Sequence, residues 1–270
     1  MKSKILEILR NKDTYVSGQE LSERFGVSRT AVWKAIHQLE EEGYRIEAVP
    51  RKGYHMVETP DVVCKEEILS LLETKWAGRN LVYLETVDST NDLAKKLADQ
   101  GAPEGTLVVA DEQTGGKGRR GRAWCTPKGS AIAMTIVLRP DIRPELASMV
   151  TLVMGLSVAK AIGSLYPVSV GIKWPNDVVV NGKKICGILT EMSAEMTGIH
   201  YLVIGTGINT NVEEFPEEIQ SVATSLIKEL GEKVNRAELI AACLKYFENR
   251  LQTPVIFGSM TGRNKCICTF

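Results

Sequence analysis

The sequence predicts an α+β protein in which a small helical domain precedes a larger domain built on a mixed or antiparallel sheet. Residues 1–60 have the pattern of short amphipathic helices and a hairpin, whereas strand patterns dominate from residue 81 onward. Most of these strands are joined by short turns, which is untypical of a doubly wound nucleotide-binding fold. The length of 270 residues suits about two domains.

The composition is that of a globular protein without a global charge. Lys plus Arg and Asp plus Glu number 33 each, so a nucleic-acid or membrane partner must be inferred from local patches. The six cysteines lack the paired spacing of a zinc site, which predicts free thiols in a reducing cytoplasm. The N-terminus lacks a signal-peptide pattern. No uncharged apolar run approaches the ~20 residues of a membrane helix, so no membrane partner is expected.

Residues 1–60 predict a winged helix-turn-helix, a common DNA-binding domain. Apolar residues on one face of the first ten residues predict the first helix. A capping box at Ser17–Glu20 opens the second helix. The third helix runs from about Ser28 to Glu42, and Gly43 ends it. Residues 44–57 then predict a hairpin with a basic tip, which is the wing.

One face of the third helix and the tip of the wing are expected to bind DNA. The inward face carries Val32, Ile36 and Leu39, which leaves polar and basic side chains on the opposite face for phosphates and base edges. The predicted contacts are Ser28, Arg29, Thr30, Lys34, His37, Arg51 and Lys52. Residues 1–60 carry ten Lys or Arg against nine Asp or Glu, so a small interaction domain with a solvated charged face is the alternative. DNA binding is favoured because the acidic run 40–42 lies away from the basic residues.

The elements of the larger domain follow a linker over residues 61–80 that contains a helix from about Lys65 to Glu73. The predicted strands are 81–85, 106–111, 131–138, 170–174, 178–180, 185–191 and 200–208. The predicted helices are 91–100, 144–165 and 236–250.

A loop rich in glycine and arginine, residues 115–122, is the most unusual segment of the chain. Residues 116–121 match G-x-G-x-x-G, but a dinucleotide site requires a helix to follow, and here another strand follows. Four cations on a flexible backbone suit a phosphate, a pyrophosphate or an acyl phosphate. The loop is expected to be loose until such a ligand arrives, because ordering a residue costs ~1–2 kcal/mol. A solvated basic loop or an RNA-binding segment is the alternative.

Further polar clusters lie at the ends of predicted strands. Asp88–Asp92 combines a helix cap with hydrogen-bonding groups for a small polar ligand. Lys173–Asp177 either directs side chains out of the sheet or forms a tight turn. An Asn-Gly turn at residues 181–182 precedes Lys184, which is a candidate anion contact or a solvated edge lysine. Residues 205–211 include glycines that allow a ligand to approach the backbone.

Taken in this order, the helix-turn-helix and the later motifs resemble the biotin–protein ligases of the repressor type. The motifs are DSTN at 88–91, EQTGGKGRRGRAW at 112–124, KWPND at 173–177, GKKICGIL at 182–189 and GTGINTN at 205–211. The resemblance covers about residues 1–248. It implies a DNA-binding domain over residues 1–60 and a catalytic domain of the biotin/lipoate ligase type over residues 81–248.

The resemblance also implies a reaction and partners. ATP would activate biotin to biotinyl-5'-AMP, with Mg²⁺ assisting, and the biotin would pass to a lysine of a biotin carboxyl carrier protein, a subunit of acetyl-CoA carboxylase. With biotinyl-5'-AMP as corepressor, a ligand-promoted homodimer would bind operator DNA and repress biotin genes. A lipoate-type ligase and a non-catalytic biotin-responsive repressor are the alternatives.

Site residues follow from the same resemblance. Lys184, Arg119 and Asp177 would be catalytic, and Mg²⁺ would lie near Asn176 and Asp177. Biotin and its adenylate would contact Ser89, Thr90, Asn91, Gln113, Lys117, Gly118, Arg119, Arg120, Arg122, Trp124, Asn176, Lys184, Gly187 and Asn209. The family loop more often begins Gly-Arg-Gly, whereas this chain has Lys117, which keeps the charge but not the bidentate geometry.

The family usually ends in an SH3-like barrel. Residues 249–270 have no clear pattern and form an atypical tail in place of that barrel, so the chain is expected to be truncated at its C-terminus. Because the barrel helps to hold ATP and the acceptor in the family, its loss would affect the ligase activity.

Overall fold

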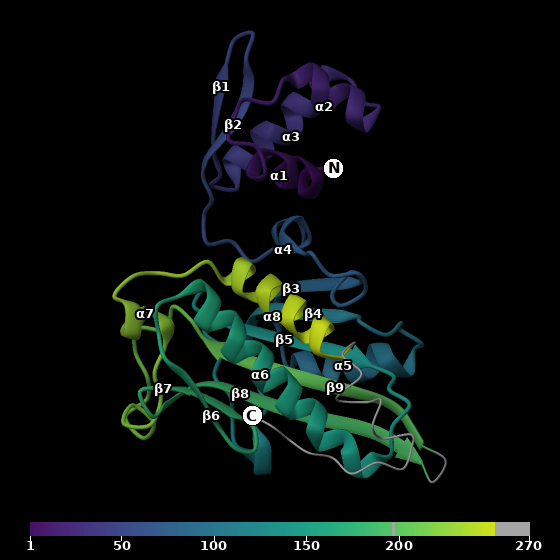
Figure 1. Ribbon diagram of the computed structural model, residues 1–270, viewed down its shortest axis with the longest axis vertical. Coiled ribbons are helices and arrows are strands. Elements are labelled where there is room, and N and C mark those ends of the chain that lie inside the picture. Colours follow the sequence, from purple (N-terminus) through teal and green to yellow (C-terminus); the bar gives the residue numbers. More distant parts are fainter. Residues whose placement is uncertain (196–197, 252–270) are drawn as a thin grey trace. The chain divides into compact units, whose positions relative to one another are not determined.

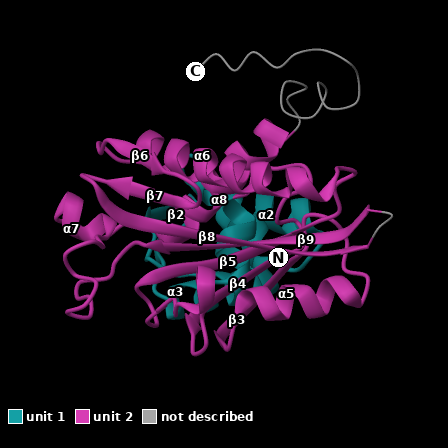
Figure 2. Ribbon diagram, turned by 90° about the horizontal axis from the view of Figure 1, so that it is seen from below, with its two compact units in different colours: residues 1–71 teal, residues 72–270 magenta. Residues whose placement is uncertain are grey.

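The computed structural model describes residues 1–195 and 198–251, and the chain divides into two compact units, residues 1–71 and residues 72–270 (Figure 2). The helix expected in the linker belongs to the first unit. Most of the predicted tail, from residue 252 onward, lies outside the described residues.

The first unit is a winged helix-turn-helix with an additional helix (Figure 1). Its elements are α1 (Lys2–Arg10), α2 (Gly18–Phe25), α3 (Arg29–Glu41), β1 (Arg45–Val49), β2 (Gly53–Glu58) and α4 (Lys65–Leu71). Strands β1 and β2 pair antiparallel, which confirms the predicted wing. The core is formed by the inward faces of the first three helices together with Tyr44 and Ile46.

Serine caps begin both helices of the helix-turn-helix. Ser17 Oγ accepts a hydrogen bond from the Glu20 backbone N–H (3.0 Å), as the capping box predicts. A capping box also predicts that the Glu20 carboxylate accepts from the Ser17 backbone N–H. That part of the prediction is wrong, because the Glu20 carboxylate accepts from Lys12 Nζ instead (2.5 Å). Ser28 Oγ accepts from the Ala31 N–H (3.2 Å), so this serine, expected to contact DNA, is also the cap of α3.

A buried carboxylate ties α4 to the rest of the first unit. Glu67 is fully buried and accepts hydrogen bonds from Arg10 Nη2 (2.6 Å) and the Tyr44 hydroxyl (2.7 Å). Burial and the neighbouring Glu67 charge raise the pKa of Tyr44 far above its ordinary value. Because a buried carboxylate is costly without partners, this network fixes α4 against α1.

The second unit is built on a seven-stranded mixed sheet (Figure 1). Its strands are β3 (Leu81–Val87), β4 (Leu107–Gln113), β5 (Ala131–Leu138), β6 (Val170–Lys173), β7 (Asp177–Val180), β8 (Lys183–Glu195) and β9 (Gly198–Asn209). Its helices are α5 (Thr90–Asp99), α6 (Ala147–Leu165), α7 (Leu226–Leu230) and α8 (Arg236–Leu251).

The strand order is β3-β4-β5-β9-β8-β7-β6. Strands β3 and β4 are parallel and are joined through α5, whereas the other neighbours are antiparallel. Helix α5 covers one face of the sheet, and α6 and α8 cover the other (Figure 2). The mixed sheet between helices confirms the predicted α+β class.

The predicted bounds of the strands agree best with the structure where every residue of the strand is buried. Strand β5 is buried at every position and has the predicted bounds. Strands β8 and β9 extend beyond the predicted segments because they pair with each other along most of their length. Helix α7 is an element that the sequence pattern did not predict.

Helix α6 is the most apolar helix of the second unit. The segment Pro144–Leu165 is long and apolar enough to span a membrane by length and composition, although Glu145 and Lys160 interrupt it, so the expectation that the chain has no long uncharged apolar run is met here. In the structure, α6 packs against α8 and the sheet, and 56% of its most apolar stretch is buried. This packing accounts for its apolar character.

Glu248 on α8 anchors the segment that leads into β3. Its carboxylate accepts hydrogen bonds from the backbone N–H groups of Lys75 (2.7 Å), Trp76 (2.9 Å) and Ala77 (2.9 Å). Burial alone would raise the pKa of Glu248, but these backbone hydrogen bonds outweigh it, and the pKa is lowered.

Replacing Glu248 with glutamine should lower stability at neutral pH and weaken the response to acid. The pKa of Glu248 is lower in the folded chain than its ordinary value of 4.5, so its contribution is present above that value and lost as the pH falls through the folded pKa. Denaturant midpoints at neutral pH and at about pH 4 measure this. Glu238→Gln, at an exposed position on the same helix, is the control. A parent chain no more acid-sensitive than E248Q would contradict this account.

Candidate functional site

A strip of sheet without side chains forms the floor of the candidate site. Gly187 on β8 lies directly opposite Gly207 on β9, and Gly205 lies two residues before Gly207. A Cβ atom at Gly205 would overlap the amide of Asn91, and one at Gly207 would overlap the indole of Trp124. These glycines therefore allow side chains from other segments to lie flat on the sheet.

The pocket above this floor brings together most of the predicted ligand-binding residues. The predicted residues that line it are Ser89, Thr90, Asn91, Gln113, Lys117, Gly118, Arg119, Trp124, Asn176, Lys184 and Gly187. The lining also includes four residues that the sequence did not single out as ligand contacts, namely Ala133, Ile188, Leu189 and Thr206. Gly205 and Gly207 complete it.

Three predicted contacts lie outside the lining. Arg120 and Arg122 are exposed on the loop. Asn209 is buried, and its amide donates to the Thr224 carbonyl (3.0 Å). Trp124 fills part of the pocket, because its indole lies over Gly187 and Gly207. The free volume that is left is about 40 Å³. Since small-molecule pockets usually measure ~300 Å³ or more, a ligand of that size requires Trp124 or its loop to move.

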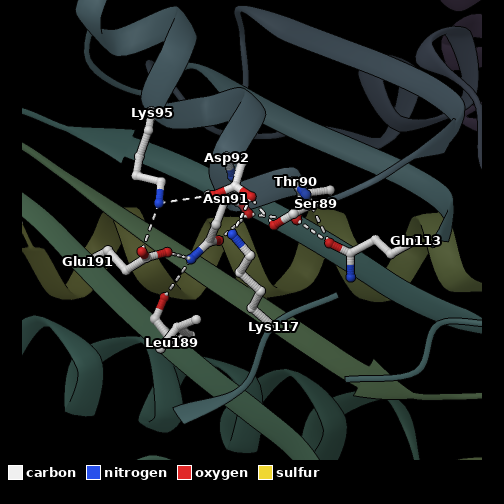
Figure 3. Close-up of polar contacts among 10 residues, drawn as sticks. Ser89, Thr90, Asn91, Asp92, Lys95, Gln113, Lys117, Leu189 and Glu191 are labelled. Atoms are coloured by element: carbon white, nitrogen blue, oxygen red, sulfur yellow. Dashed lines mark hydrogen bonds and ion pairs between the residues drawn. The ribbon is translucent and has the colours of Figure 1, made fainter. Parts of the chain in front are cut away.

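The amide of Asn91 is occupied by protein partners (Figure 3). Its Nδ2 donates to Glu191 Oε2 (2.7 Å) and to the Leu189 carbonyl (3.2 Å). Its Oδ1 lies 2.7 Å from the Thr135 hydroxyl, which is also 2.8 Å from Thr90 Oγ1 and donates to one of the two at a time. Asn91 thus braces the pocket wall and has little capacity left for a ligand.

Gln113 fixes the other side of this wall. Its Oε1 accepts from the backbone N–H of Thr90 (2.9 Å) and from the Thr90 hydroxyl (3.0 Å), and its Nε2 donates to Thr126 Oγ1 (3.1 Å). Ser89 Oγ accepts from the Asp92 N–H at 3.4 Å, a weak cap for α5. Ser89 is consequently the residue of the 88–91 motif whose hydroxyl is least committed to the protein.

The glycine–arginine loop has a defined conformation held at two points. Lys117 Nζ lies 2.5 Å from Asp92 Oδ2, and Arg119 Nη1 donates to Asn176 Oδ1 (2.7 Å). The hydrogen bond from Lys117 lowers the pKa of Asp92, and Lys95 adds to this effect. Within the loop, the Gly118 N–H donates to the Arg122 carbonyl (2.7 Å). The loop therefore spans the pocket from α5 to the β6–β7 turn.

Lys184 forms the charged end of the pocket, and Asp177, which lies outside the lining, is paired with it. Lys184 Nζ lies 2.8 Å from Asp177 Oδ1 and 5.3 Å from the centroid of the Trp124 ring. Asn176 Nδ2 donates to the Ile188 carbonyl (3.2 Å), which holds the β6–β7 turn against β8. The ammonium group thus faces the floor beside one carboxylate, where an anionic ligand could replace that carboxylate.

The residues expected near Mg²⁺ do not form a metal site by themselves. Asp177 is paired with Lys184, and the Asn176 carbonyl oxygen accepts from Arg119. Residues 1–195 and 198–251 contain no group of three His, Cys, Asp or Glu side chains that could hold a metal ion. One carboxylate that is already paired with a lysine is too few for a site made of protein ligands alone.

In the first unit, the residues expected to bind DNA are all exposed. Arg29 Nε donates to Gln19 Oε1 (2.7 Å), and Lys52 Nζ lies 5.6 Å from the centroid of the Tyr15 ring. A groove between the wing and the start of α2 is lined by Arg29, Arg51 and Lys52. This arrangement presents cations on both the helix and the wing.

The fold and the pocket define a ligase-type domain joined to a helix-turn-helix domain. The model of the Biotin/lipoate A/B protein ligase family matches residues 83–209, and an HTH domain model matches residues 2–55. A solved biotin protein ligase from Aquifex aeolicus in complex with biotin and ATP superposes with a TM-score of 0.58 at 36% identity, over 65% of this chain and 72% of that one.

Curated relatives define the family more closely. The bifunctional ligase/repressor BirA of Bacillus subtilis is 44% identical over 90% of this chain and 76% of its own length. The Escherichia coli protein of the same description is 30% identical over 92% of this chain and 76% of its own length. The chain belongs to the bifunctional ligase/repressor family.

Replacing Asp92 with asparagine should release one end of the loop. The Lys117–Asp92 pair is half exposed, so its loss should affect the loop and leave global stability nearly unchanged. Trypsin should cleave at the loop arginines about 3- to 10-fold faster, as peptide mapping would measure. Glu85→Gln, which removes the exposed Lys128–Glu85 pair, is the control. Equal cleavage rates in D92N and the parent would show that this pair does not hold the loop.

Proposed function

We propose that this chain activates biotin with ATP, transfers it to a lysine of a biotin carboxyl carrier protein, and represses transcription when the adenylate is bound. The observation that carries the proposal is the juxtaposition of Lys184 and Arg119 with a side-chain-free floor in a pocket closed by a cationic loop. Such a pocket suits a ligand with an apolar body and an anionic end. Family membership and the solved biotin and ATP complex support biotin as that ligand.

In the first step, a carboxylate oxygen of biotin attacks the α-phosphorus of ATP. A phosphorus–oxygen bond forms, the bond to the leaving pyrophosphate breaks, and biotinyl-5'-AMP remains. Negative charge accumulates on the phosphate oxygens. The cations that stabilise this charge are Lys184 and the exposed Arg119, Arg120 and Arg122. Lys184 must turn from Asp177 toward the ligand, which exchanges one anionic partner for another.

In the second step, the amine of the acceptor lysine attacks the acyl carbon, and AMP leaves with the electrons of the anhydride bond. The amine must lose a proton for the amide to form. Asp177 is free to accept it once Lys184 has turned to the phosphate, which makes this carboxylate the proton acceptor of the proposal.

Several finer assignments belong to the same proposal. Ser89, Thr90 and Gln113 bind the polar head of biotin, and Asn91 supports them from behind. Trp124 covers the adenine once it has moved. Mg²⁺ enters with the phosphates of ATP, which supply most of the oxygen ligands that this ion prefers. No step above depends on the ion.

Repression is proposed to require two chains. Ligand binding exchanges the protein contacts that hold the loop for contacts to the ligand and promotes a homodimer, and two copies of α3 then contact the two half-sites of an operator. The predicted DNA contacts on α3 and the wing are exposed, which is consistent with this role. Biotin titrations in the presence and absence of ATP, followed by sedimentation, measure whether the dimer depends on the adenylate.

Replacing Lys184 with methionine should reduce adenylate formation about 100-fold or more, because a preorganised cation is lost where charge develops. Biotin-dependent exchange of pyrophosphate into ATP measures this step. Lys183→Met is the matched control, since Lys183 precedes Lys184 in the strand but is exposed and lies outside the pocket. A K184M variant within about twofold of the parent rate would contradict the proposal. Exchange driven by lipoate and not by biotin would favour the lipoate-type alternative.

A further inference from the structure

Trp33 is a large apolar side chain on α3 that the fold leaves uncovered. It is 54% exposed, although it lies in the middle of a helix whose inward face is fully packed. Its ring centroid lies 5.4 Å from that of His37, which is also exposed. Burying an aromatic side chain is among the larger gains available to an interface, so Trp33 is a side chain whose contact with a partner on this face of α3 would be stabilising.

The position of Trp33 on the helix indicates which partner. Arg29, Trp33 and His37 are spaced four residues apart and therefore form one row along the exposed side of α3. At its start, this row meets the groove between the wing and α2, where Arg29 lies with Arg51 and Lys52. Arg29 thus lies about one helical turn before Trp33, and Lys34, which is also exposed, follows Trp33 directly. The row places Trp33 where a base edge would lie if Arg29 and Lys34 contact phosphates.

We propose that Trp33 reads the C5-methyl group of a thymine in the major groove. This inference rests on the DNA-binding role proposed above and adds a residue that determines sequence preference. The indole offers an apolar ring and a single N–H donor but no acceptor. Thymine is the base that presents a methyl group in the major groove, so the ring and the methyl are complementary. A phosphate, by contrast, would engage only the N–H donor of the indole and would leave the apolar ring uncovered.

The experiment compares thymine with deoxyuridine, which lacks only this methyl group. The full chain, with biotin and ATP present, first selects duplexes from a randomised pool. Each thymine of the selected sequence is then replaced in turn by deoxyuridine. In each half-site, one replacement should weaken binding by the parent about 3- to 10-fold. The same replacement should leave the Trp33→Ala variant unchanged, because the methyl contact is already absent.

Three controls separate this contact from other effects. Lys34→Ala should weaken binding to all duplexes alike and reduce the salt dependence, as expected for a phosphate contact. Val57→Ala removes an exposed apolar side chain from β2 and should leave the deoxyuridine pattern of the parent intact. Trp33→Phe keeps a ring and should retain part of the methyl effect. Unchanged biotin transfer by the Trp33→Ala variant shows that the chain is otherwise intact.

The outcomes are distinguishable from a failure of the proposed function. A chain that selects no sequence from the pool contradicts the repressor role itself, and the inference falls with it. A chain that selects a sequence but shows no thymine whose methyl effect depends on Trp33 retains the repressor role and overturns the inference. A uniform loss of affinity in W33A across all duplexes also overturns it, since such a loss carries no sequence information.

Discussion

The strip of bare backbone at Gly187, Gly205 and Gly207 is the constraint on which the rest of the site depends. Adjacent strands normally cover both faces of a sheet with side chains, and here one face is open over neighbouring residues of β8 and β9. Asn91 and Trp124 can reach the sheet only because these positions lack a Cβ atom. The walls of the pocket are then supplied by segments distant in the chain, and the site is a consequence of the glycine positions.

The cations of the site are held by partners that a ligand can displace. Lys117 is paired with Asp92, and Lys184 with Asp177, while Arg119 is bound to the neutral amide of Asn176. The pair made by Lys117 is half exposed, and such pairs contribute little to stability. An incoming phosphate or carboxylate therefore replaces weak contacts with stronger ones in a more enclosed space. The protein contacts also keep the cations near their working positions, which reduces the entropy lost on binding.

The sequence predicted which segments form this site better than it predicted the side-chain contacts among them. Strand β5 could be placed because its run is apolar at every position except Thr135, and Lys184 because it follows an Asn-Gly turn into a strand. The role of Asn91 could not be derived. Its amide is bound by Thr135 and Glu191, which lie 44 and 100 residues away in the sequence, and no local pattern reports such a pairing. The same reason explains why Glu20 was assigned to its own helix cap: a competing partner, Lys12, lies outside the motif.

The separation of the molecule into two units bears on how a ligand could control DNA binding. The first unit has its own hydrophobic core, and Glu67 holds α4 within it through Arg10 and Tyr44. The winged helix therefore needs nothing from the ligand pocket to form its DNA-binding face. A ligand that only brought two of these DNA-binding faces together in a dimer would still raise the affinity for the operator strongly. The reason is that binding to the second half-site becomes intramolecular once the first half-site is bound. Control through assembly also requires no rearrangement inside the helix-turn-helix. We therefore expect the ligand dependence of repression to reside in the association of two chains, with the recognition surface itself unchanged.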